Sequence, residues 1–152
     1  MTHLNPHIHV YEVFSGTYMD AMRALHTDRR IPLTVEGIAE RRVNSLGTYP
    51  EVIDGWWRMT YSTCDGAIFH PKGEVRIVRK SELLKLCNTK TSQNGLEYIE
   101  VDFDSYDGIE GLIIPKPPNQ GLVPQPIIKK VQEAIWEFLV QEATVRKAHF
   151  DY

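Results

Sequence analysis

The chain has few cysteines and no long apolar run, and both absences narrow its class. Two cysteines in 152 residues, Cys64 and Cys87, are too few for the disulfide framework of a small secreted domain. No apolar segment approaches the ~20 residues that a membrane-spanning helix needs. The first ten residues carry three histidines instead of the basic and then apolar profile of a secretion signal. We therefore expect a cytoplasmic protein with reduced cysteines and no membrane contact.

A strong excess of charge of one sign is also missing. The 17 Lys and Arg residues against 20 Asp and Glu residues give a formal net charge of −3, so there is no general attraction to nucleic acid. Hydrophobic residues make up 42% of the chain and charged residues 24%, which is typical of a globular protein and argues against disorder. The length fits a single domain over residues 1–152.

The commonest enzyme motifs are absent as well. There is no glycine-rich phosphate loop, no G-x-S-x-G elbow, no H-E-x-x-H helix and no paired C-x-x-C. On this negative evidence, our first hypothesis is a small binding or interaction protein without identifiable catalysis, whose partner is a protein or a small molecule.

The spacing of apolar residues predicts helices first, then strands, then a helix. Helices are expected over residues 17–28 and 34–46, where Thr17 and Thr34 precede apolar positions at helical spacing and are suitable N-caps. Alternation predicts strands over 8–14, 56–62, 96–103 and 112–114, and a hairpin over 67–78. After the proline-rich segment 115–126, one long helix is expected over 127–147. This order favours an α+β fold with an N-terminal helix pair, a mainly antiparallel sheet and a long C-terminal helix.

The N-terminal histidines give an alternative hypothesis. His7 and His9 are two residues apart, so on a strand both imidazoles project to one side and can reach the same ion. His70, in the loop of the predicted hairpin, is a candidate third ligand. Together they point to a divalent metal and to a metal-dependent hydrolase, with Asp65 as a further contributor. The competing interpretation is a set of exposed surface histidines.

Two other groups of residues carry alternatives of the same kind. Glu100, Asp102 and Asp104 would share one face of the strand over 96–103, either to bind Mg²⁺ or, more simply, as a solvated outer face. Cys64 and His70 would lie across the hairpin, either as nucleophile and base or as an ordinary core thiol and a turn residue.

A third hypothesis is a winged-helix-like DNA-binding regulator. The two N-terminal helices with their short joint resemble the first part of such a unit, the hairpin would be its wing, and Arg29, Arg30, Arg41 and Arg42 would contact phosphate. The segment over 49–55, where the recognition helix should lie, is acidic and interrupted by glycine. A structural helix pair without nucleic acid explains the same pattern.

Three tryptophans suggest where a partner would bind. Trp56 and Trp57 are adjacent on a predicted strand, so one of them should face solvent and mark a contact surface. Trp136 and Val140 lie off the main apolar stripe of the predicted C-terminal helix. Covering them would require a second surface, so this helix is compatible with a homodimer.

Overall fold

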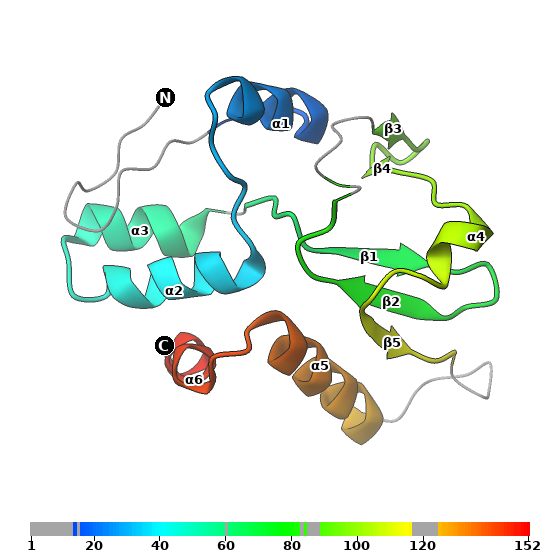
Figure 1. Cartoon of the computed structure of the whole chain (residues 1–152). Coiled ribbons are helices and arrows are strands. Elements are labelled where there is room, and N and C mark those ends of the chain that lie inside the picture. The colour runs from blue at the N-terminus through cyan, green and yellow to red at the C-terminus, as the bar shows by residue number, and fades with distance from the viewer. Residues whose placement is uncertain (1–13, 15, 60, 83, 85–88, 117–124) are drawn as a thin grey trace.

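The computed structural model describes residues 14, 16–59, 61–82, 84, 89–116 and 125–152, and these form an α+β fold (Figure 1). Apart from the short helix α4 (Phe103–Tyr106), the described helices lie toward the two ends of the chain and the strands in its middle, as the order of the sequence pattern predicts. No helix in these ranges is both long enough and apolar enough to cross a bilayer. The predicted strand over 8–14 lies outside the described residues, apart from Phe14.

The N-terminal helix pair is confirmed, and both helices begin at the predicted caps. Helix α1 (Tyr18–Thr27) follows Thr17, whose hydroxyl accepts from the amide of Asp20 at 3.2 Å. Helix α2 (Val35–Ser45) follows Thr34, whose hydroxyl accepts from the amide of Gly37 at 2.9 Å. Each cap satisfies an amide that the helix leaves without a partner, which stabilises a helix by about 1 kcal/mol.

The strand expected over 56–62 is wrong, because residues up to Arg58 belong to helix α3 (Pro50–Arg58). Pro50 at the first turn suits a helix start, and the helix continues through Gly55. Trp56, which is only 1% exposed, then lies one turn after Val52, and the two form a small core. This burial outweighs the strand preference of the aromatic residues.

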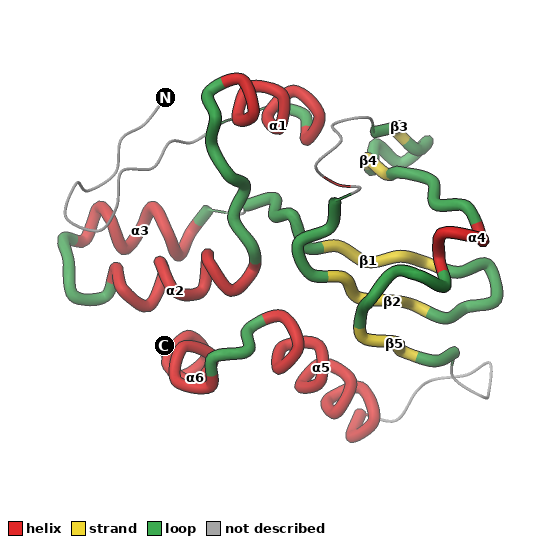
Figure 2. The backbone as a smooth tube through the Cα atoms, in the orientation of Figure 1, coloured by secondary structure: helices red, strands yellow, loops and turns green. Residues whose placement is uncertain are grey.

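The predicted hairpin is confirmed as strands β1 (Gly66–Phe69) and β2 (Val75–Val78), which pair antiparallel with Phe69 opposite Val75. Its loop closes with the His70 amide donating to the Glu74 carbonyl at 2.8 Å. Gly73 has φ of +98°, which only glycine adopts without strain. Strand β5 (Leu112–Ile114) pairs antiparallel with the other edge of β2 and completes a three-stranded sheet (Figure 2).

The strand expected over 96–103 is largely replaced. Only Glu97–Tyr98 (β4) pairs, with Lys90–Thr91 (β3), and the chain then enters the short helix α4 (Phe103–Tyr106). Asp102 caps α4 by accepting from the Ser105 amide at 2.7 Å, which lowers the pKa of its carboxyl. Glu100 instead pairs with Lys90 at 2.8 Å. The acidic residues therefore do not share a strand face.

The long C-terminal helix predicted over 127–147 is two helices, α5 (Gln125–Leu139) and α6 (Ala143–Asp151). At the break, the carboxylate of Glu36 on α2 accepts from the amides of Gln141 and Glu142. Negative charge is favourable at a helix N-terminus, so Glu36 stabilises a new helix start at this point. Helix α6 consequently packs against α2 (Figure 1).

Candidate ligand-binding site

A small hollow of about 130 Å³ lies where the N-terminal and C-terminal helices meet. Its walls come from α2, from the connection between α3 and β1, and from α5 and α6. These segments are far apart in the sequence, so the hollow exists only in the folded chain. The lining residues are Val35, Ile38, Ala39, Arg42, Tyr61, Thr63, Trp136 and His149.

Asp65 positions the wall formed by the connection between α3 and β1. One of its carboxylate oxygens accepts from the Val35 amide at 2.7 Å, and the other from the Lys80 amide at 2.8 Å. The Cys64 amide also donates to the Leu33 carbonyl at 3.1 Å. These bonds fix the connection beside the start of α2, and Thr63 therefore faces the hollow.

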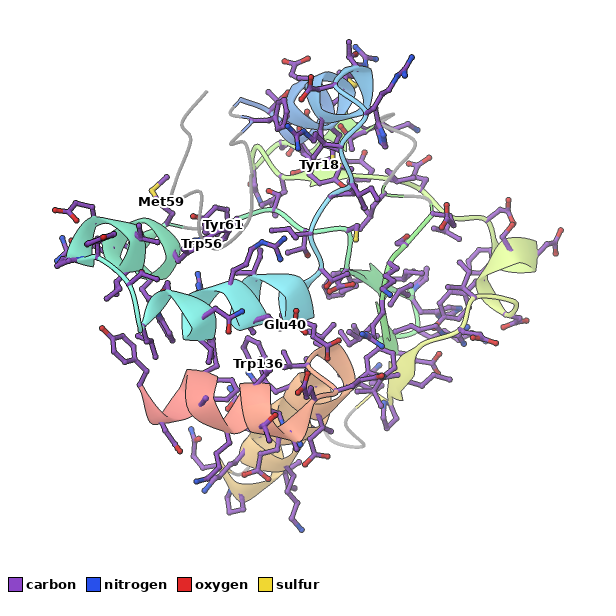
Figure 3. All side chains as sticks on the ribbon, turned by 60° about the vertical axis from the view of Figure 1, so that its left-hand side comes forward. Tyr18, Glu40, Trp56, Met59, Tyr61 and Trp136 are labelled. Atoms are coloured by element: carbon purple, nitrogen blue, oxygen red, sulfur yellow. The ribbon has the colours of Figure 1, made fainter. Side chains whose placement is uncertain are left out.

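Tyr61 forms another part of the same wall. Its hydroxyl donates to the Gly55 carbonyl at 2.7 Å, and its ring lies 5.3 Å from that of Trp56 (Figure 3). Burial raises the pKa of Tyr61 above its ordinary value against the opposing charge of Arg42. The hydroxyl is therefore protonated at neutral pH, and its proton is directed to a main-chain oxygen.

Arg42 joins three helices at one edge of the hollow. Its Nε donates to the Trp56 carbonyl at 2.8 Å and its Nη2 to the Met59 carbonyl at 3.1 Å, which ties α2 to the end of α3. Its Nη1 lies 3.4 Å from Nε2 of His149 on α6, and its guanidinium carbon is 5.8 Å from the centre of the Trp57 ring.

His149 is held neutral by these neighbours. Arginine has no acceptor, so Nε2 of His149 must accept and the imidazole proton lies on Nδ1. Burial, and then the charge of Arg42, lower the pKa of His149 below its ordinary value. Its ring stacks on that of Trp57 at 5.1 Å and lies 6.3 Å from that of Trp136.

Trp136 closes the hollow from α5, between α2 and the C-terminal helices (Figure 3). Its ring meets that of Phe150 edge-on at 4.9 Å. Val140, at the end of α5, is only 1% exposed. Part of the covering that Trp136 requires is thus supplied by Phe150 on α6 of the same chain.

Of the three histidines of the predicted metal site, His70 is the one that lies within the described residues. His7 and His9 lie outside the described residues. His70 lies in the β1–β2 loop, where its Nδ1 accepts from the Lys72 amide at 3.0 Å and its ring contacts those of Phe103 and Tyr106. Within the described ranges, no three His, Cys, Asp or Glu side chains are placed to hold a metal ion.

Cys64 and His70 lie at opposite ends of β1. At the rise of an extended chain they are roughly 20 Å apart, far beyond the reach of a nucleophile and its base. The Cys64 side chain is buried, and both oxygens of the neighbouring Asp65 are occupied by main-chain amides. Cys64 and Asp65 therefore stabilise the fold beside the hollow.

Helix α3 covers most of the segment 49–55, which the winged-helix hypothesis assigns to the recognition helix. Its exposed side chains include Glu51, Asp54 and Arg58, and Arg58 pairs with Asp54 at 3.4 Å. Trp57 is half-buried on this helix, so the tryptophan expected to face solvent from a strand instead packs against Tyr152 and His149.

His149 is the site residue that sequence reasoning missed. No local pattern marks it, because its role depends on α6 turning back to α2. The one available signal was Trp136, whose position off the apolar stripe indicated that another surface covers it. Comparison with known proteins finds no matching family model and no significant match among curated proteins or solved structures.

Proposed function

We propose that the protein is a non-catalytic binding protein whose ligand site is the hollow between α2, α5 and α6. The observation that carries this proposal is the size of the hollow, about 130 Å³, together with its largely apolar lining. A cavity of about 150 Å³ lined by apolar side chains takes up benzene, whereas pockets for drug-sized ligands measure about 300–1,000 Å³. The occupant is therefore a single small group, about the size of one aromatic ring.

The composition of the walls supports binding. Ile38 and Ala39 are buried and present apolar surface, and Trp136 and Tyr61 add aromatic rings. The Thr63 and Tyr61 hydroxyls donate to the main-chain oxygens of Asp65 and Gly55, which fixes their orientation. A site whose walls are fixed before the ligand arrives loses little conformational entropy on binding.

A small molecule is accordingly the partner that we propose, in preference to a protein.

The cytoplasm remains the proposed compartment, because Cys64 is a buried thiol and such thiols persist in reducing surroundings.

A titration with a neutral ring-sized compound, benzamide, tests this function. We expect the methyl NMR signals of Val35, Ile38 and Ala39 to shift on addition, because these groups line the hollow. The methyl groups of Ile113, an exposed residue on β5, serve as the internal control and should not move.

Filling the hollow provides the matched variant. Val35→Phe adds a ring at the lining itself and should abolish the benzamide shifts, whereas Ile113→Val, remote from the lining, should leave them unchanged. Benzamide shifts that persist in Val35→Phe would rule out the hollow as a ligand site. An absence of shifts in the natural protein with both benzamide and benzoate would do the same.

A further inference from the structure

The hollow has a chemical selectivity that its size alone does not define. We propose that it binds a small aromatic monocarboxylate, with the ring between the apolar walls and the carboxylate on the guanidinium of Arg42. This inference rests on the proposed function, since it names the class of ligand for the same site.

The hydrogen bonds of Arg42 leave part of its guanidinium available. The group carries five N–H donors. One on Nε, one on Nη2 and one on Nη1 are directed to Trp56, Met59 and His149, so two remain. A carboxylate is the acceptor whose two oxygens best match two neighbouring guanidinium donors.

The charge of Arg42 is also not balanced locally. Four other arginines form ion pairs with Asp or Glu, whereas no carboxylate in the described part of the chain pairs with Arg42. A partly buried guanidinium without a counter-charge favours an anion at its open side. The four paired arginines are Arg30, Arg58, Arg76 and Arg79.

His149 adds a second group that responds to an anion. In the ligand-free protein the adjacent charge of Arg42 opposes protonation of the imidazole. The other elements packed on His149 present the rings of Trp57 on α3 and Trp136 on α5. A bound carboxylate would offset the charge of Arg42 and so raise the pKa of His149.

The remaining walls explain why the acid should be aromatic. The rings of Trp136 and Tyr61 offer faces and edges on which a planar ring packs, and Ile38 and Ala39 remove its apolar surface from water. The volume of about 130 Å³ admits one ring and leaves the carboxylate at the edge occupied by Arg42.

The test compares benzoate with benzamide on the full chain, because the two have the same shape and differ in charge. Calorimetric titration at low ionic strength should give at least about tenfold tighter binding for benzoate, since hydrogen bonds to charged groups are the stronger ones. Benzoate, but not benzamide, should also raise the pKa of His149, followed through the NMR signal of its imidazole.

Variants locate the carboxylate. Arg42→Lys keeps the charge but loses the planar fork, so it should weaken benzoate binding about tenfold and leave benzamide binding nearly unchanged. Arg58→Lys makes the same change on an exposed helix face and should affect neither ligand. Because Arg42 also supports α3, circular dichroism must show that the variant is folded; the comparison of the two ligands on the natural protein needs no variant.

The outcomes distinguish failure of the carboxylate proposal from failure of the proposed binding function. Equal affinities for benzoate and benzamide, with the lining methyl signals shifted by both, would overturn the carboxylate proposal and leave the binding function intact. If neither compound moves those signals, the binding function itself fails. Tighter benzoate binding that leaves the pKa of His149 unchanged would place the anion elsewhere and also overturn the inference.

Discussion

Two arginines in different regions of the molecule have almost the same surroundings and differ in one partner. Arg76 lies on β2 in the sheet region, and its Nη1 donates to the carbonyls of Tyr106 and Ile109 at 2.7 and 2.6 Å. Its guanidinium carbon is 4.2 Å from the centre of the Tyr106 ring, and the carboxylate of Glu74 is 3.9 Å away. In the helical region, Arg42 likewise has two main-chain carbonyls and an aromatic ring, but a neutral histidine takes the place of the carboxylate.

Because of this difference, we infer that Arg76 and Arg42 have different roles. The Arg76 side chain is only 8% exposed, and its charge is compensated from within the chain. The Tyr106 hydroxyl also donates to the Glu74 carboxylate, and this bond raises the pKa of Tyr106. Arg76 thus stabilises the sheet, whereas Arg42, at the edge of a hollow, has no carboxylate partner within the described part of the chain. Recognition sites are expected where the fold leaves such a group unbalanced.

Removing the Arg76 side chain is expected to have the largest effect on stability. Arg76→Ala removes the donor to two carbonyls and the counter-charge of the Glu74 carboxylate, which keeps only its bond from the Tyr106 hydroxyl. We therefore expect a loss of about 3 kcal/mol in the free energy of unfolding. Urea denaturation measures this loss. Arg58→Ala, which removes an exposed arginine, is the control and should change stability by less than about 0.5 kcal/mol. A loss below about 1 kcal/mol for Arg76→Ala would contradict the structural role.

A pair of glycines tests the two regions by packing alone. A Cβ at Gly111, beside β5, would lie 2.3 Å from the Ile77 carbonyl oxygen, so Gly111→Ala must displace β5 from β2. We expect a cost of about 2 kcal/mol, visible as a lower melting temperature. A Cβ at Gly47, between α2 and α3, meets nothing within 4 Å, and Gly47→Ala should be neutral or slightly stabilising. Equal melting temperatures for the two variants would show that the β2–β5 pairing is looser than described.

The parts of the fold that local chemistry determines could be predicted from the sequence. Thr17 and Thr34 cap their helices through amides three residues away, and the hairpin over 67–78 contains its own turn residues. The break after α5 depends instead on Glu36, which is 105 residues before Gln141. A local apolar stripe carries no information about such a contact, so the sequence predicts one continuous helix over 127–147.

The candidate site was less predictable for the same reason. Arg42 and His149 are 107 residues apart, and each looks like an ordinary surface residue in its own segment. Helix α3 was misassigned because Trp56 and Trp57 favour strands locally, while the burial of Trp56 is decided by packing against Val52. The pairing of Arg42 with His149 appears only once α3 and α6 are both placed against α2.

Asp65 lies at the junction of the two regions and offers a smaller, more specific test. Its carboxylate accepts from Val35 at the start of α2 and from Lys80 after β2. Asp65→Ala should lower the free energy of unfolding by about 1.5 kcal/mol, because two main-chain amides lose a charged acceptor. It should also broaden the methyl NMR signal of Val35 at the hollow. Asp54→Ala, which removes an exposed carboxylate on α3, is the matched control. If both variants unfold at the same urea concentration, Asp65 does not couple the regions.

The smallest expected effect concerns pH and isolates the partner by which the two arginines differ. In the folded chain, burial and then the charge of Arg42 lower the pKa of His149 below its ordinary value of 6.5, which it keeps in the unfolded chain. Below pH 6.5 the unfolded chain therefore binds more protons at this site than the folded chain does. The contribution of neutral His149 to stability is complete above that pH and is lost as the pH falls toward the lowered pKa. Urea unfolding of the natural protein and of His149→Gln, compared between about pH 7.5 and pH 5, should show the steeper loss on acidification in the natural protein. Parallel curves would mean that the imidazole titrates alike in both states, and the contact with Arg42 would then have no energetic consequence.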